Sequence, residues 1–159
     1  MHNEPIFDLK EAHKYFSAAC FNKAWELVEK EDRTQEEDEE MIQLSLASTW
    51  HWSQREDHSS TKQSISFWQI SRVYAILGET ENARKYGQLC LNVSMRDEVR
   101  SFYLAYAYET MARAEGIAGN REKMLDYVRK SRKTIERVIK DEEKKMIGDD
   151  LESIISLVD

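Results

Sequence analysis

The sequence predicts an all-α protein built from antiparallel helical hairpins. Its 159 residues include one proline and five glycines, so the two residue types that most strongly interrupt helices are scarce. Hydrophobic residues make up 41% of the chain and charged residues 33%, a balance that suits thin helical layers with a large solvated surface. A β-rich chain of this length would need more turn residues between its strands. The length fits a single domain that spans residues 1–159.

Capping sequences mark the starts of the first two helices. Asp8 and Glu11 have the spacing of a capping box, in which an N-cap side chain and a Glu three residues later satisfy free backbone N–H groups. We expect the first helix to continue to about residue 30, because apolar residues then recur at helical spacing. Thr34 and Glu37 repeat the capping pattern and open a second helix over about 35–57.

Polar N-cap residues and glycines bound the other five expected helices. These helices run from Ser60 to Gly78, over 81–93 after a cap at Thr80, from a cap at Asp97 to Gly119, over 121–146 after a cap at Asn120, and from Asp149 onward. The connections between them are short, so consecutive helices are predicted to be antiparallel neighbours.

The chain repeats itself at an offset of 41 residues. Residues 65–91 and 106–132 share five identities at this offset. Two of the identical residues, Gly78 and Gly119, fall where one helix should end and the next begin. Only glycine takes the left-handed conformation of such a turn at little cost. The two segments therefore predict two hairpins of one design.

This hairpin pattern resembles the tetratricopeptide repeat, which has W-x2-L-G-x2-Y before its turn and A-x3-F after it. The matching positions are Phe67, Ile70, Ser71, Tyr74, Ala83 and Gly87 in the first copy, and Tyr108, Met111, Ala112, Glu115, Met124 and Val128 in the second. The second copy departs from the pattern, because Glu115 occupies a core position. The resemblance covers residues 64–132 and implies that the hairpins formed by the about seven expected helices stack as a short right-handed superhelix. The segments around Trp52 and Arg72 also resemble bacterial proteins, a similarity that implies no activity.

Histidine and cysteine positions give no metal-binding pattern. Helical metal sites usually place ligands at i and i+3 or i+4, and His13, His51 and His58 have no Asp, Glu, His or Cys at these offsets. Cys20 and Cys90 also lack such neighbours and are expected to be reduced thiols in helix interiors. We therefore expect no metal and no cofactor.

Composition also restricts partners and location. The net charge of −7 argues against nucleic acid as a partner, and no apolar run reaches the length of a signal peptide or a membrane span. A cytoplasmic location is expected. Residues 31–40 hold seven acids and one arginine, whereas the expected sixth helix is basic. We expect these two patches to attract each other, within one chain or in a weak homodimer.

Trp50 and Trp52 lie in the most distinctive segment of the chain. They point about 200° apart on a helix, so the second helix is expected to be covered on two sides. His51, Arg55 and His58 form a polar stripe between the tryptophans, either solvated or in contact with an anion.

One expected helix face offers a binding site. In proteins that resemble tetratricopeptide repeats, the first helix of each hairpin lines a concave groove. If the turn glycines set the register, Trp68 and Arg72 point into that groove. The offset of 41 residues then puts Glu109 and Arg113 beside them, with Tyr106 one turn earlier. The two arginines either form paired hydrogen bonds with a carboxylate of a partner or pair with Glu109 and neighbouring acids to hold the hairpins together.

The sequence therefore predicts a helical-repeat interaction module that binds a protein segment or peptide, in regulation or assembly. A sensor for a small anionic ligand is the alternative. An enzyme whose catalytic residues converge from separate helices is the third, since the chain has no phosphate-binding loop and no nucleophile elbow.

Overall fold

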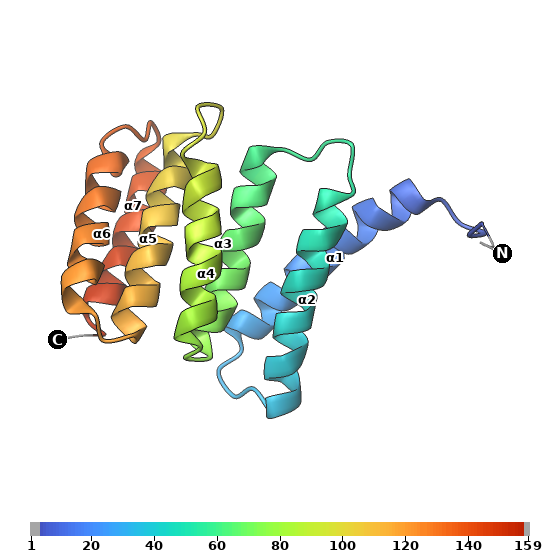
Figure 1. The fold of residues 1–159 in the computed structure, drawn as a ribbon, viewed down its shortest axis with the longest axis horizontal. Coiled ribbons are helices and arrows are strands. Elements are labelled where there is room, and N and C mark those ends of the chain that lie inside the picture. Colours follow the sequence, from blue (N-terminus) through green and yellow to red (C-terminus); the bar gives the residue numbers. More distant parts are fainter. Residues whose placement is uncertain (1–3, 158–159) are drawn as a thin grey trace. The chain divides into compact units, whose positions relative to one another are not determined.

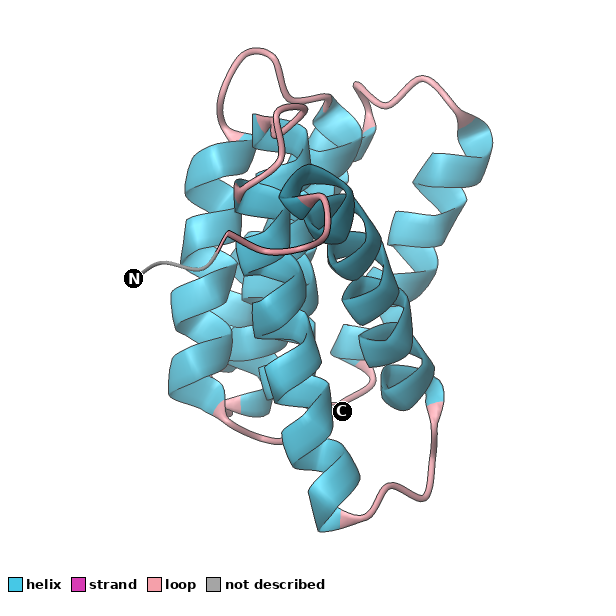
Figure 2. Ribbon diagram, turned by 90° about the vertical axis from the view of Figure 1, so that its right-hand side faces the viewer, coloured by secondary structure: helices cyan, strands magenta, loops and turns pink. Residues whose placement is uncertain are grey.

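A computed structural model gives the fold of residues 4–157. Seven α-helices and no β-strand occur in this range, which confirms the all-α prediction (Figures 1 and 2). In chain order they are α1 (Leu9–Glu29), α2 (Gln35–Ser53), α3 (Ser60–Ile76), α4 (Thr80–Ser94), α5 (Ser101–Ile117), α6 (Arg121–Ile135) and α7 (Asp141–Ile155).

The chain divides into two compact units, unit 1 within residues 1–59 and unit 2 within residues 60–159. Unit 1 contains α1 and α2, and unit 2 contains α3 to α7. The expectation that residues 1–159 behave as one domain stays a prediction.

Unit 1 is a helical hairpin with both of its predicted helix starts in place. The side chain of Asp8 caps α1 by accepting hydrogen bonds from two backbone N–H groups of the first turn. Thr34 and Glu37 form the reciprocal capping box at the start of α2. Between the helices, the Ser48 hydroxyl donates a buried hydrogen bond of 2.7 Å to the carbonyl oxygen of Ser17. This bond satisfies a polar group that would otherwise be costly to bury.

Unit 2 stacks the hairpins α3–α4 and α5–α6 and adds α7 beside α5. Helix α5 is central, because α3, α4, α6 and α7 all contact it (Figure 1). Small residues let the neighbouring helices approach α5 closely, and Ala105, Ala107, Ala112 and Ala114 are all buried. The largest apolar cluster joins α5, α6 and α7 through Met124, Val128, Ile147, Leu151 and Ile154.

Both turns that the repeat predicts have the same backbone geometry. Gly78 has a φ of 73° and Gly119 a φ of 76°, in the left-handed region. In each turn, the N–H of the residue after the glycine donates to the carbonyl oxygen five residues earlier, at 2.9 Å. This is the hydrogen bond of a Schellman motif, which satisfies a carbonyl group at the end of a helix. The predicted pair of turns is confirmed.

The two hairpins of unit 2 also repeat a contact between their helices. The Cys90 thiol on α4 donates to the carbonyl oxygen of Ser64 on α3 at 3.4 Å. Forty-one residues later, the Ser131 hydroxyl on α6 donates to the carbonyl oxygen of Ala105 on α5 at 2.8 Å. The sequence repeat thus corresponds to a structural repeat.

Several predicted helix boundaries are wrong. Helix α6 ends at Ile135 rather than near residue 146, and α7 begins at Asp141 rather than at Asp149. The break carries no local signal, because its N-cap Lys140 makes no side-chain capping bond and Gly148 lies inside α7. Burial of Val138, only 4% exposed, anchors the connection instead.

Two of the three remaining predicted caps are also wrong. Thr80 lies inside α4, and Asp97 lies several residues before α5 begins. Asn120 does cap α6, since its side chain accepts a hydrogen bond from the N–H of Lys123.

Candidate functional site

The five residues that the sequence selected lie together in unit 2. Trp68 and Arg72 come from α3, and Tyr106, Glu109 and Arg113 come from α5. The Arg72 guanidinium carbon lies 5.7 Å from the centre of the Trp68 ring. The Trp68 and Tyr106 rings meet edge to face, with centroids 6.0 Å apart. We call these five residues, together with Asp150 and Ser153 of α7, the arginine cluster.

A buried carboxylate stands at the centre of the arginine cluster. Glu109 is 0% exposed, and its Oε1 atom accepts hydrogen bonds from Nη2 of Arg113 at 2.7 Å and Nη2 of Arg72 at 3.2 Å. A buried charge is tolerated only when it is paired and hydrogen-bonded. Of the two roles that the sequence left open for the arginines, pairing with Glu109 is the one observed.

Helix α7 contributes two residues that the sequence analysis missed. The Tyr106 hydroxyl donates to Oδ2 of Asp150 at 2.8 Å, and Arg113 donates to Oγ of Ser153 at 3.2 Å. Burial, together with this bond to Asp150, raises the pKa of Tyr106 far above its ordinary value, so the hydroxyl remains a donor. Nη2 of Arg72 lies 3.9 Å from the Asp150 carboxylate. Two arginines therefore face two carboxylates, and the formal charges balance.

The repeat offset was the signal that could have found Asp150. Asp150 lies 41 residues after Glu109, which lies 41 residues after Trp68. Each arginine also donates a hydrogen bond to a residue 37 positions later in the chain. Arg72 donates to the carboxylate of Glu109, and Arg113 donates to the carbonyl oxygen of Asp150. Helix α7 thus repeats the placement of α3 and α5. The misplaced boundary of α7 concealed this relation.

The accessible edge of the arginine cluster is on α7. The side chains of Arg72 and Arg113 are each 14% exposed, whereas Asp150 is 34% exposed and Ser153 is exposed. A carboxylate that displaced Glu109 from the arginines would leave a buried charge unpaired. The cluster is therefore suited to polar contacts at its Asp150 edge, without release of Glu109.

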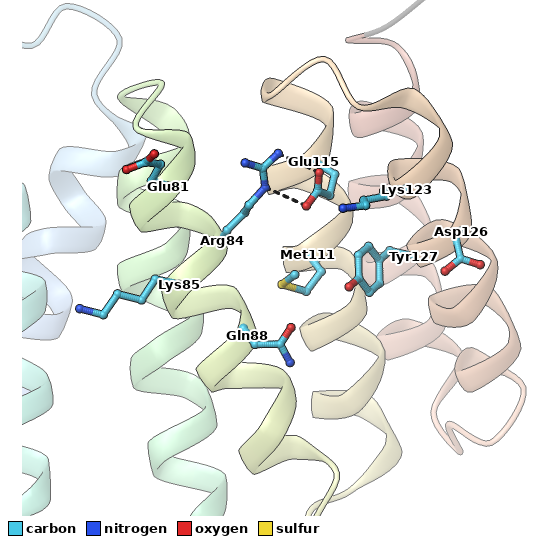
Figure 3. A pocket seen from close by; sticks show the side chains of 9 residues that line it. All are labelled: Glu81, Arg84, Lys85, Gln88, Met111, Glu115, Lys123, Asp126 and Tyr127. Carbon is cyan, nitrogen blue, oxygen red and sulfur yellow. Dashed lines mark hydrogen bonds and ion pairs between the residues drawn. The ribbon is translucent and has the colours of Figure 1, made fainter.

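A second polar feature of unit 2 is an open groove over α4, α5 and α6, with a volume of about 530 Å³ (Figure 3). We call it the outer groove. Nε and Nη2 of Arg84 bind the two carboxylate oxygens of Glu115 at 2.8 and 3.0 Å. The groove is lined by side chains that include Arg84, Gln88, Met111, Glu115, Lys123 and Tyr127.

Cys90 is unsuited to act as a nucleophile. It is 1% exposed, and burial raises the pKa of its thiol to about 12. A thiol with such a pKa stays protonated near neutral pH, whereas the thiolate is the reactive form. The expected buried thiol is confirmed for Cys90, and Cys20 is half-buried.

A pair of histidines joins α1 and α2 in unit 1. Nδ1 of His13 lies 2.9 Å from Nδ1 of His51, and the ring of Trp50 packs edge-on against both imidazoles. The sequence did not indicate this contact, because 38 residues separate the two histidines and no local pattern relates them. Trp50 is 57% exposed, so the expectation that α2 is covered on both tryptophan faces is wrong for this residue. Arg55, a member of the expected polar stripe, binds the carboxylate of Asp57.

The histidine pair predicts a loss of stability in acid. Burial and the neighbouring His13 lower the pKa of His51 below its ordinary value of about 6.5. The unfolded chain therefore takes up a proton at a higher pH than the folded chain, and stability falls as the pH drops below about 6.5. We expect the melting temperature to fall less between pH 7 and pH 5 in His51→Gln than in the wild type. His58→Gln is the control, and equal pH profiles for His51→Gln and the wild type would contradict the prediction.

The acidic and basic patches each find partners nearby. Pairs within unit 1 include Lys23–Glu40, Lys30–Glu37 and Arg33–Asp38, and pairs within unit 2 include Arg129–Asp126, Lys130–Asp126 and Arg132–Glu152. These pairs neutralise part of each patch. Weak association of two chains stays a prediction.

Residues 4–157 lack two features that would point to particular functions. No three His, Cys, Asp or Glu side chains in this range gather closely enough to hold a metal ion. None of the helices described there combines the length and apolar character that a membrane span needs. Comparisons with known protein families, curated proteins and solved structures found no match to the chain.

Proposed function

We propose that the chain is a tetratricopeptide-like interaction module of the cytoplasm, which binds a segment of a partner protein along α3, α5 and α7. The observation that supports this most directly is the register of the arginine cluster. Trp68, Glu109 and Asp150 occupy the same repeat position on α3, α5 and α7. Helix α5 contacts both α3 and α7. Repeated positions on successive helices form the extended surfaces by which helical repeat proteins bind their partners.

The polar edge of the cluster supports the same proposal. Asp150 and Ser153 are accessible, while the arginines behind them hold the carboxylate of Glu109 in place. An ordered carboxylate and hydroxyl can accept hydrogen bonds from the backbone of an extended segment without rearranging. The balanced charge of the cluster favours such polar contacts over capture of an anion.

A sensor for a small anionic ligand is less well supported at this site. Both guanidinium groups already bind Glu109, so an anion would have to compete with a buried carboxylate. An enzyme is supported still less, because the thiol of Cys90 is buried and the tyrosine hydroxyl of Tyr106 is held protonated.

Site-directed photo-crosslinking tests the proposed binding face. A photoreactive amino acid replaces Ser153, at the edge of the cluster, or Arg129, which is exposed on α6. We expect the Ser153 position to crosslink one partner in lysate of the source cells, and the Arg129 position not to do so. Asp150→Asn should reduce that crosslink about tenfold, the effect of losing one charge-assisted hydrogen bond. Equal crosslinking from both positions, or an undiminished crosslink in Asp150→Asn, would refute the proposal.

A further inference from the structure

The outer groove lies where the second repeat departs from the first. In the first repeat, Tyr74 on α3 stacks on Tyr86 of α4, with ring centroids 5.8 Å apart and planes inclined by 13°. Phe67 packs against Tyr86 as well, at 6.3 Å. Tyr86 therefore packs against two aromatic rings.

The second repeat keeps only one of these ring contacts. Tyr127 lies 41 residues after Tyr86, and its ring packs against Tyr108 at 6.5 Å, as Tyr86 packs against Phe67. Glu115 stands 41 residues after Tyr74, so a carboxylate replaces the second ring. Glu115, Met111 and Tyr127 all line the outer groove. The groove thus opens where the first repeat places a tyrosine ring.

Two cations surround the Glu115 carboxylate. Its side chain is 4% exposed and binds Nε and Nη2 of Arg84, which leaves Nη1 of Arg84 outside this pair. Figure 3 shows Lys123 of α6 pointing toward Glu115 from the other side of the groove. Two positive charges against one negative charge make the centre of the groove favourable for an anion.

The acidic residues at the rim weaken this attraction only in part. Asp126 forms ion pairs with Arg129 and Lys130 on its own helix. Figure 3 shows the carboxylate of Glu81 turned away from the pair of Arg84 and Glu115, and Glu81 acts on Arg84 only as a weaker, more distant charge than Glu115. The lining as a whole holds three cations and three carboxylates, so the excess of positive charge is local to Arg84 and Lys123 beside Glu115.

We propose that the outer groove binds an aromatic carboxylic acid. Its ring fills the place of the missing tyrosine, against Tyr127 and the thioether of Met111, which both favour aromatic partners. Its carboxylate lies between Lys123 and Nη1 of Arg84, where charge-assisted hydrogen bonds hold it. The volume of about 530 Å³ is ample for a single ring with a short acidic chain.

The acid could be a free small molecule or the C-terminal aromatic residue of a peptide, which present the same ring and carboxylate. Four probes distinguish the contributions of the ring, the negative charge and the peptide terminus. 3-Phenylpropanoate carries ring and charge, 3-phenylpropanamide lacks the charge, butanoate lacks the ring, and N-acetyl-glycyl-phenylalanine presents a peptide terminus. The readout is the NMR shift of the methyl group of Met111, a residue that lines the groove.

We expect 3-phenylpropanoate or the peptide to shift the Met111 signal with saturation, and the amide and butanoate to bind at least about tenfold more weakly. A shift by the peptide alone identifies a protein terminus as the source. If neither acid shifts the signal at its solubility limit, or if the amide binds as well as the acid, the proposal is wrong.

Two variants locate the site. Glu115→Tyr restores the residue of the first repeat and should abolish binding by filling the groove. Lys123→Gln removes one cation from an exposed position and should weaken the acid about tenfold, whether or not Glu115→Tyr folds. Lys145→Gln, which removes an exposed charge on α7, is the matched control and should bind normally. Undiminished binding in Lys123→Gln would overturn the assignment.

Discussion

Replacing both Arg72 and Arg113 with alanine should destabilise unit 2 by about 3–5 kcal/mol, the usual effect of removing the partners of a buried charge. Glu109 is 0% exposed and both arginines bind its carboxylate, so the double variant leaves that charge without a cation. If the arginines served only to contact a partner, the change would stay within about 0.5 kcal/mol. Urea denaturation followed by circular dichroism measures the difference.

Two controls make this result specific. Arg132→Ala removes an arginine from an exposed pair with Glu152 and should change stability by no more than about 0.5 kcal/mol. Adding Glu109→Gln to the double variant removes the unpaired charge and should recover part of the loss. A double variant as stable as the wild type would show that the arginine cluster does not hold α3 and α5 together.

Leu151→Ala should have an effect of similar size, about 2–5 kcal/mol, because it removes a buried side chain and leaves a cavity. Leu151 is 1% exposed and packs in the apolar cluster with Met124, Ile147 and Ile154. It follows Asp150 directly, so the same packing that stabilises α7 also positions the accessible edge of the arginine cluster.

Urea denaturation again measures the change, and hydrogen exchange of α7 locates it. Leu157→Ala truncates a leucine that is 59% exposed and should be close to neutral. Equal stability of Leu151→Ala and Leu157→Ala would mean that α7 does not belong to the cooperative core of unit 2.

Features that depend on residues near one another in the chain could be predicted from the sequence. The caps at Asp8, Thr34 and Asn120 satisfy backbone groups within their own first turns. The left-handed turns at Gly78 and Gly119 need only a residue without a Cβ atom at the end of a helix. Local signals of this kind are complete within a few residues, so they could be recognised without knowledge of the packing.

The sequence repeat also made it possible to predict which residues of the candidate site lie together. Because equal positions in successive hairpins face the same way, the offset of 41 residues brought Trp68, Arg72, Glu109 and Arg113 together correctly. It could not tell whether the arginines contact a partner or a residue of the same chain. The role of the arginines depends on how deeply the side chain of Glu109 is buried, and this burial results from the packing of α3, α5 and α7 together.

Contacts between residues that no local pattern relates could not be predicted, because they depend on how the helices pack. The histidine pair joins residues 38 apart, Tyr106 reaches Asp150 across 44 residues, and Arg84 reaches Glu115 across 31. Such pairs form because packing brings two helices to a particular distance and rotation, and many side chains contribute to that result. The start of α7 has the same origin: burial of Val138 and the packing of Leu151 place it, where the local sequence favoured Asp149.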